Sequence, residues 1–365
     1  MVKVRNRKVT YKDVARRAGV SLATVSRVFS GASRVSDDLY EHVNKAARDL
    51  GIDLRRENTG TTLVFVLSNR QMLHVFHSRI FFGAQEYCKT RGVDVLFLSL
   101  DYSPLVPWNE LVLPKLLRRQ DVVQAAILAG TNSENLLVSL RQQGIPFAIL
   151  GNNILDATDD YYTVDSDDVQ GAFDLTSYLQ GLGHKDVWFV GNTALPWFAR
   201  CYRGYSLAME KVGAVPRLSK FESVDEREAG YLGTRAILSK GEPVTAIFAG
   251  TDTAAQGVYS ALEDCRVRIP QDISVVGCND TCGELLRPSL TTIREFPEQL
   301  GKHLAELAIG QVARTMTAPR RISIPTAIVK RDSCQAPSES CIRKELLFTT
   351  PRVLEKGSSD ENTSQ

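Results

Sequence analysis

Hydrophobic residues recur at helical spacing through the first fifty residues of the chain. Val14 and Ala18 belong to one apolar stripe, and Val25 and Val28 form a second one. Periodicity of this kind is typical of short amphipathic helices. We therefore expect two short helices that pack against each other, followed by a third helix over residues 36–50 that closes a three-helix core.

Turn and capping residues mark where these helices begin and end. Thr10, followed three positions later by Asp13, is typical of a helix start, because a hydroxyl and a carboxylate are both favourable at that end. Gly19 suits a tight turn, and Ser21 is a good cap for the second helix. Two helices joined in this way form a helix-turn-helix, whose second helix enters the major groove of DNA. An ordinary helical hairpin is the alternative.

From Leu63 onwards, short apolar runs alternate with helical patterns. This alternation favours parallel, doubly wound sheets with ligands at the carboxyl ends of the strands. Because the series occurs twice, we predict an α/β fold with two lobes and a ligand cleft between them. The predicted buried strands are residues 63–67, 95–100, 125–129, 147–150, 187–190, 245–249 and 273–276.

Two polar stretches flank the lobes. Residues 52–62 are rich in turn formers and are predicted to link a helical head, residues 1–51, to the lobes. Residues 333–365 are polar and lack leucine heptads, so we expect a disordered tail and no tetramerisation helix.

Charge is distributed unevenly along the chain. The net charge is only +2, but residues 1–56 carry 13 Lys and Arg against 6 Asp and Glu. Lys and Arg gain affinity for a polyanion by displacing the counterions condensed on its phosphates. The N-terminal segment is therefore predicted to bind nucleic acid, with a solvated basic face as the alternative.

Composition places the chain among ordinary globular proteins, with 43% hydrophobic and 24% charged residues. No signal-peptide core follows the basic N-terminus, and no apolar run approaches the ~18 residues of a membrane span, which predicts a cytoplasmic protein with no membrane partner. Seven cysteines without a Cys-x-x-Cys pair fit reduced thiols. The spacings of Cys278 with Cys282 and of His74 with His77 are not predicted to bind metal, and we expect no cofactor.

Enzyme signatures are missing from the sequence. It contains no Gly-x-x-x-x-Gly-Lys-Ser/Thr loop, no Gly-x-Gly-x-x-Gly after the first strand, no Gly-x-Ser-x-Gly elbow and no His-Glu-x-x-His. The sequence favours a regulator over an enzyme. Two alternatives stay open: a small-molecule-binding protein without a DNA role, and an α/β enzyme with a helical appendage.

Several blocks, in order, resemble the lactose-repressor (LacI-type) family of transcription regulators over residues 9–332. The matching blocks are Asp13–Ala15, Ala18–Ser21, Thr24–Val28, Leu182–His184, Thr245–Asp252, Ile269–Gly277 and Pro288–Ile293. The resemblance implies a core built like periplasmic sugar-binding proteins. It also implies a repressor that binds a near-palindromic DNA operator as a homodimer and is controlled by a small polar effector, such as a sugar.

The resemblance further implies that the chain crosses between the lobes three times. On that basis the strand near Leu290 returns to the first lobe and Ile322–Val329 returns to the second. The first lobe then comprises residues 63–164 and about 290–318, and the second comprises residues 165–289 and about 319–332.

Roles in DNA reading follow from the same resemblance. Leu22 and Ala23 occupy positions at which family members vary their base contacts, and as apolar side chains they are expected to meet thymine methyl groups. Arg27 is expected to reach a guanine or a phosphate. Phosphate contacts are expected from Ser21, Thr24 and Ser26, and Thr10 and Tyr11 complete the set that the resemblance implies. Separately, we expect Arg55 and Arg56 in the linker to contact phosphates.

In the lobes, Asp252 matches a family position that hydrogen-bonds ligand hydroxyls or ring nitrogens; capping of the following helix is its alternative role. Trp197 and Phe198 are expected either to stack on a sugar face or to pack in the core. The remaining predicted effector-binding residues are Ser68, Asn69, Phe76, Asn192, Arg200 and Asn279.

Two features depart from the family pattern. Cys201 stands where the family has a ligand-gripping arginine, three residues before the glycine matched by Gly204, with Arg200 and Arg203 as the nearest arginines. The linker is roughly half a dozen residues shorter than the family's hinge, whose short helix inserts leucines into the minor groove. We therefore expect no such helix, less DNA bending and weaker coupling between head and lobes.

Overall fold

The computed structural model describes residues 10–30, 36–50, 61–70, 74–119, 122–154, 160–313 and 320–338. The chain divides into two compact units. Unit 1 comprises the residues up to Asp168 together with Leu195–Arg200 and Glu295–Ala327, and unit 2 comprises Val169–Ala194, Cys201–Arg294 and the chain from Ile328. Most of the predicted linker, including Arg55 and Arg56, lies outside the described residues, as do residues 339–365.

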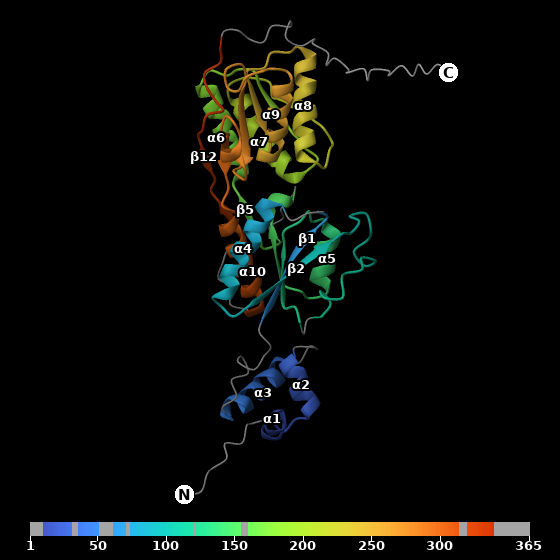
Figure 1. Cartoon of the computed structure of the whole chain (residues 1–365). Coiled ribbons are helices and arrows are strands. Elements are labelled where there is room, and N and C mark those ends of the chain that lie inside the picture. The colour runs from blue at the N-terminus through green and yellow to red at the C-terminus, as the bar shows by residue number, and fades with distance from the viewer. Residues whose placement is uncertain are drawn as a thin grey trace, which may run out of the picture. The chain divides into compact units, whose positions relative to one another are not determined.

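The helical head has the three helices that the periodicity predicts (Figure 1). They are α1 (Tyr11–Ala18), α2 (Leu22–Ser30) and α3 (Asp37–Asp49). Alanine and valine side chains make up the buried core that the helices share, and small side chains of this kind let helix axes approach closely. The core residues are Val14, Ala15, Ala18, Val25, Val28, Val43, Ala46 and Ala47.

Unit 1 contains a six-stranded parallel sheet. In chain order its strands are β1 (Thr62–Ser68), β2 (Asp94–Leu100), β3 (Ala125–Leu128), β4 (Phe147–Leu150), β5 (Thr163–Ser166) and β11 (Arg321–Ile324), and their order in the sheet is β11-β5-β4-β3-β1-β2. Besides the head helices, this unit contains α4 (Val75–Lys89), α5 (Glu134–Gln142) and α10 (Pro297–Ala313), with a 3-10 turn at Gly151–Asn153.

Side chains of β1 alternate between the two faces of this sheet. Leu63 and Phe65 pack with α4 and α10, which lie side by side in Figure 1, whereas Val64 and Val66 pack with α5 on the other face. Because both faces are covered, β1 is apolar along nearly its whole length.

Unit 2 contains a second six-stranded sheet, in the order β12-β10-β9-β8-β6-β7. Its strands are β6 (Val187–Val190), β7 (Arg217–Ser219), β8 (Ala246–Ala249), β9 (Ser274–Asn279), β10 (Thr291–Arg294) and β12 (Ala327–Val329). Its helices are α6 (Asp168–Gly181), α7 (Pro196–Lys211), α8 (Glu226–Lys240) and α9 (Asp252–Asp264), of which α7 begins in unit 1 and enters unit 2 at Cys201. Neighbouring strands from β10 to β7 are parallel, as the two series of strands and helices predict.

The returning strands follow the prediction only in part. β12, the Ala327–Val329 part of the predicted segment, joins the second sheet as predicted, whereas β10 and β11 lie in the sheets opposite to those predicted. β10, directly after Leu290, pairs with β9 in the second sheet, and β11 pairs with β5 in the first sheet. β5 itself still belongs to the first sheet, so unit 2 begins after Asp168 and not at residue 165. Such short strands of mixed polarity carry no pattern that tells which sheet edge they join.

Two further predictions about burial are wrong. β2, predicted as a buried strand, lies at the edge of its sheet and exposes Leu96 and Phe97. Residues 333–338, predicted to begin a disordered tail, are ordered: Ser333 is fully buried and donates a hydrogen bond to the carbonyl of Val275 at 2.6 Å.

No helix within the described ranges is both long and apolar enough to cross a membrane.

Candidate functional site

The turn between α1 and α2 fixes where α2 begins. Gly19 has φ of 63°, a left-handed conformation that glycine adopts without strain. The hydroxyl of Ser21 accepts a hydrogen bond from the amide of Thr24 at 3.0 Å, and the two hydroxyls hydrogen-bond each other at 2.8 Å. The predicted cap is therefore present. Both hydroxyls stabilise the helix start, and their contacts with phosphates stay a prediction.

The first turns of α2 expose the residues predicted to read DNA. Ser21, Leu22, Ala23, Ser26 and Arg27 are all exposed, whereas Val25 and Val28 on the opposite side belong to the head core. Nε of Arg27 donates to the carbonyl of Ala23 at 3.3 Å, so the guanidinium lies back towards the helix N-terminus. A helix that buries one stripe and presents small side chains and one cation on the other suits entry into the major groove.

Thr10 and Tyr11 lie at the start of α1. One carboxylate oxygen of Asp13 accepts hydrogen bonds from the Thr10 amide at 2.8 Å and the Thr10 hydroxyl at 2.7 Å, which forms the predicted cap. Tyr11 is exposed beside it. These contacts hold the first turn of α1 in place and leave the Tyr11 side chain accessible.

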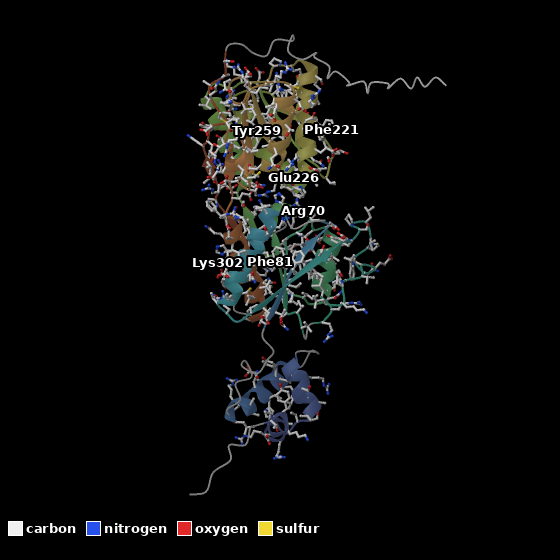
Figure 2. The ribbon with its side chains drawn as sticks, viewed as in Figure 1. Arg70, Phe81, Phe221, Glu226, Tyr259 and Lys302 are labelled. Atoms are coloured by element: carbon white, nitrogen blue, oxygen red, sulfur yellow. The ribbon has the colours of Figure 1, made fainter. Side chains whose placement is uncertain are left out.

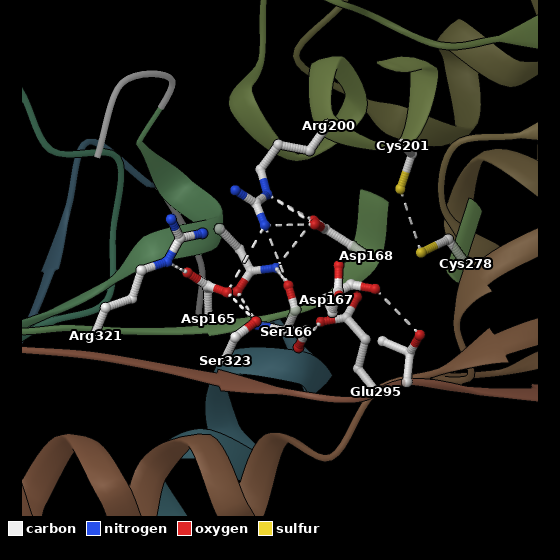
Figure 3. Close-up of polar contacts among 12 residues, drawn as sticks. Asp165, Ser166, Asp167, Asp168, Arg200, Cys201, Cys278, Glu295, Arg321 and Ser323 are labelled. Atoms are coloured by element: carbon white, nitrogen blue, oxygen red, sulfur yellow. Dashed lines mark hydrogen bonds and ion pairs between the residues drawn. The ribbon is translucent and has the colours of Figure 1, made fainter. Parts of the chain in front are cut away.

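A cluster of polar side chains lies at the carboxyl end of the first sheet (Figure 3). Nε of Arg200 donates to both carboxylate oxygens of Asp168, at 2.8 and 3.0 Å, and Nδ2 of Asn152 donates to one of them at 3.0 Å. Burial raises the pKa of the Asp168 carboxyl group, and the neighbouring Arg200 guanidinium opposes that shift. Arg200, predicted to bind effector, is thus the ion-pair partner of a buried carboxylate.

The same cluster joins β5 to β11. Buried Asp165 accepts hydrogen bonds from Nε of Arg321 at 2.9 Å and from the hydroxyl of Ser323 at 2.7 Å. The hydroxyl of Ser166 donates to the carboxylate of Glu295 at 2.7 Å. Hydrogen-bonded charge networks of this kind fix the positions of their members.

Ser68 is the last residue of β1 and Asn69 follows it; both side chains hydrogen-bond to other protein groups. The fully buried hydroxyl of Ser68 donates to Oδ1 of Asn132 at 2.7 Å. Oδ1 of Asn69 accepts from the amide of Tyr102 at 2.9 Å, and Asn69 adopts a positive φ of 52°. These contacts fix the conformation of the chain where it leaves β1.

Phe76 and His77 lie in the first turn of α4 with their rings edge to face, 5.6 Å apart. Burial lowers the pKa of His77 well below its usual value, so the ring is neutral at neutral pH. Nε2 of His77 lies 3.5 Å from Nδ2 of Asn153, whereas its buried Nδ1 has no hydrogen-bond partner among the described residues. A buried ring nitrogen without a partner costs free energy unless something supplies one.

Trp197 and Phe198 differ in their surroundings. The guanidinium of Arg70, labelled in Figure 2, lies over the Trp197 ring at 4.0 Å from its centroid. Phe198 is fully buried, which favours core packing among the two roles left open for it. Trp197 is only half-buried, and the Arg70 guanidinium covers one face of its ring.

Asp252 is fully buried at the start of α9 in unit 2. Its carboxylate accepts hydrogen bonds from the Thr292 hydroxyl at 2.6 Å and from the Gly283 amide at 3.2 Å. Burial raises the pKa of Asp252 to about 7. The alternative role as helix cap is wrong, because the hydroxyl of Thr251 caps α9 by accepting the amide of Ala254 at 3.0 Å.

Asn192 lies just after β6, and Asn279 is the last residue of β9, both in unit 2. The Asn192 side chain donates to the carbonyl of Ser223 at 3.2 Å and accepts the amide of Ala194 at 3.1 Å. Asn279 has a positive φ of 87° and accepts the hydroxyl of Thr281 at 2.8 Å. Both side chains therefore shape the loops that leave their strands.

Cys201 does not supply the positive charge of the arginine that the family has at this position. Its side chain is buried, and its Sγ lies 3.5 Å from Sγ of Cys278. Among the residues that the structure describes, no group of three or more His, Cys, Asp or Glu side chains is arranged to hold a metal ion.

The predicted effector residues thus fall into two sets. Ser68, Asn69, Phe76, Trp197, Phe198 and Arg200 belong to unit 1, and Asn192, Asp252 and Asn279 belong to unit 2. Sequence reasoning missed Asn152, Asn153 and Asp168 in the first set. Their positions shortly after β4 and β5 could have identified them as candidates, because ligands meet the carboxyl ends of parallel strands.

Comparisons with known proteins match both parts of the chain. The sequence model "Bacterial regulatory proteins, lacI family" matches residues 10–52, and "Periplasmic binding protein-like domain" matches residues 176–334. The HTH-type transcriptional regulator RegA of Clostridium saccharobutylicum is 27% identical over 332 residues, which cover 88% of this chain and 98% of RegA. The HTH-type transcriptional repressor PurR of Edwardsiella ictaluri is 26% identical, over 89% of this chain and 96% of PurR.

Solved structures share the fold. The transcriptional regulator CelR in complex with cellobiose superposes with a TM-score of 0.66 at 24% identity, and the lac repressor dimer bound to operator and the anti-inducer ONPF with a TM-score of 0.62 at 22% identity. Each alignment covers 90% of this chain and 100% of the other. A helix-turn-helix head followed by a core like the periplasmic binding proteins defines a class of transcription regulators, not of enzymes. The chain thus combines a helix-turn-helix head of the lacI family of bacterial regulatory proteins with a periplasmic-binding-protein-like domain.

Proposed function

We propose that this protein is a transcriptional repressor that acts in the cytoplasm and binds a near-palindromic operator as a homodimer. Binding of a small polar effector would raise or lower its affinity for the operator. The observation that carries the proposal is α2, which buries Val25 and Val28 and exposes Leu22, Ala23 and Arg27 at its capped N-terminal end. Leu22 and Ala23 would contact thymine methyl groups, and Arg27 a guanine or a phosphate.

The effector that the described side chains favour is an uncharged sugar or sugar derivative. Arg200 is paired with Asp168, and Cys201 stands where the family has its ligand-gripping arginine, so neither position offers an uncompensated positive charge to an acidic ligand. The groups left to bind a ligand are amides, hydroxyls, aromatic rings and the open Nδ1 of His77, which suit hydroxyl groups. Among relatives, the CelR structure contains cellobiose, and a LacI family regulator from Enterococcus faecium contains ribose.

The surface that would hold two copies together lies on β2 and α4. We call it the dimer face; its exposed apolar residues are Val75, Phe82, Leu96 and Phe97. β2 is an edge strand in contact with α4, and exposed apolar side chains on an edge strand mark an interaction site or an aggregation risk. Phe81, labelled on α4 in Figure 2, packs edge-on against Phe97 at 6.2 Å and supports this face from within.

A nuclease footprint on the DNA upstream of the protein's own gene tests the DNA-binding part. We expect protection of two half-sites related by an approximate two-fold axis, because two identical heads meet the duplex. Uniform protection without a preferred site would contradict the proposal.

A thermal-shift screen that pairs neutral sugars with the corresponding sugar acids tests the effector class. A neutral sugar at a hundredfold excess over its Kd is expected to add about 2.7 kcal/mol to the free energy of unfolding. Stabilisation by the acids alone would overturn the assignment of a neutral ligand and leave the DNA-binding result untouched.

A further inference from the structure

Two thiols from distant parts of the sequence meet inside unit 2. Cys201 lies on α7 and Cys278 on β9, their Sγ atoms are 3.5 Å apart, and both side chains are buried. Figure 3 shows the two side chains pointing towards each other. Two other cysteines of this unit have different surroundings, because Cys282 contacts Gln256 and Cys334 contacts the carbonyl of Val275.

The two sulfur atoms are in van der Waals contact and are not bonded. A disulfide needs a separation of about 2.05 Å, so the sulfurs must approach by about 1.5 Å. We expect side-chain rotation and a small shift of α7 relative to β9 to supply this movement. Both residues belong to the same compact unit, so the bond requires no rearrangement between units.

We propose that Cys201 and Cys278 form a reversible disulfide when the protein meets a peroxide. One thiol loses its proton, and its thiolate attacks a peroxide oxygen, which gives a sulfenic acid and a hydroxide that takes up the lost proton to form water. The second thiol also loses its proton, and its thiolate attacks the sulfenic sulfur, which forms the disulfide and displaces a hydroxide that takes up this proton to form a second water. In total, two thiols and one hydrogen peroxide yield one disulfide and two waters, and a cytosolic dithiol reverses the reaction.

Access of a peroxide to the buried pair is expected through local opening of the chain around it. Arg200, next to Cys201 in sequence, has 16% of its side chain exposed, and Asn279, next to Cys278, is half-buried. Partly exposed residues therefore flank both cysteines, whose own side chains are buried. Oxidation would tie the beginning of α7 to the end of β9 and so give the regulator a second input, the thiol redox state, that does not depend on the effector or on DNA binding.

Peptide mapping of the oxidised full-length protein tests the proposal. The reduced protein is treated with hydrogen peroxide, its remaining thiols are blocked, and it is digested without reductant for mass spectrometry. We expect a peptide pair linked through Cys201 and Cys278 that disappears after treatment with dithiothreitol. Cys265→Ala, at the end of α9, is the matched control and should leave the linked pair intact.

Amide hydrogen exchange provides a second readout. In the oxidised protein, exchange over residues 196–205 should slow severalfold, and Cys201→Ala and Cys278→Ala should both abolish the change. Alanine retains the apolar character of a buried thiol, and the mapping of the unmodified chain decides the question even if a variant fails to fold. Full alkylation of both thiols after peroxide treatment and unfolding, or linkage of either one only to another cysteine, would overturn the proposal.

Discussion

The carboxyl group of Asp252 shows how the fold changes the chemistry of a single residue. It is enclosed at the start of α9, and burial raises its pKa to about 7 although the Thr292 hydroxyl donates to it. The folded state therefore holds this proton up to a pH at which the unfolded chain has lost it. The contribution of this proton to the free energy of unfolding is fully present below about pH 4. It decreases as the pH rises and is lost once the pH has passed through 7.

We predict that Asp252→Asn removes this pH dependence. Between pH 5 and 8 the unmodified protein should lose up to about 3 kcal/mol more unfolding free energy than the variant, because about two pKa units of the shift fall in this range and each corresponds to about 1.4 kcal/mol. Denaturant titrations across this pH range measure the difference. Asp264→Asn, at the far end of the same helix, is the control and should follow the unmodified protein. Parallel pH profiles for the unmodified chain and Asp252→Asn would contradict the account.

Single residues also show where sequence reasoning stops. The sequence identifies Asp252 as a candidate because it follows a strand within a family block. The helix, however, is capped by Thr251, one position earlier. The contact between Cys201 and Cys278 joins residues 77 positions apart, and periodicity carries no information about such a pair. His77 was assigned no role, because only the packed structure reveals that its Nδ1 lacks a partner.

At the scale of the element, α2 depends on its cap. Ser21→Ala removes the hydroxyl that accepts the Thr24 amide and should cost the head about 1 kcal/mol. Ser26→Ala, an exposed position within the same helix, is the matched control and should be neutral or slightly stabilising, because alanine favours helix. Hydrogen exchange of the α2 amides compares the two variants. Equal exchange rates in both would show that the cap contributes nothing.

The close packing of α4 against α10 depends on glycine. A methyl group at Gly301 would overlap the carbonyl of Ile80 on α4, so the two helices would have to separate. Gly301→Ala should therefore destabilise unit 1 by about 1–3 kcal/mol. Gly181→Ala is the control, because a methyl group there meets nothing within 4 Å. The denaturation midpoints of the two variants measure this, and an unchanged midpoint for Gly301→Ala would be evidence against the packing.

At the scale of the whole molecule, the sequence predicted the kinds of parts but not all their connections. The three helices of the head and the two parallel sheets follow from apolar periodicity, which is strong in segments such as Leu63–Leu67. β10 and β11 were exchanged because short strands such as Arg321–Ile324 mix apolar and polar residues and join their sheets only through long-range pairing. The exposure of Leu96 and Phe97 was missed because an edge strand that binds a partner has the same apolar pattern as a buried strand.

Assembly of two copies through the dimer face gives a prediction at this scale. Phe82 is 54% exposed on α4, and Phe82→Glu would place a charge in the proposed interface. We expect the variant to sediment as a monomer and to bind the operator more weakly, because one head alone meets half a site. Leu105→Glu, at a position 90% exposed outside this face, should remain a dimer. A dimeric Phe82→Glu variant would place the interface elsewhere.

The central claim is that the exposed side of α2 meets base edges and phosphates while the rest of the molecule controls when it does so. Operator affinity of the Thr24→Ala/Arg27→Ala double variant, measured by fluorescence anisotropy over a range of salt concentrations, tests it most directly. We expect affinity to fall about tenfold or more and the salt dependence to decrease by about one phosphate contact. Arg48→Ala removes the same charge from exposed α3 and should change affinity by less than about threefold. A double variant that keeps both the affinity and the salt dependence of the unmodified protein would contradict the account.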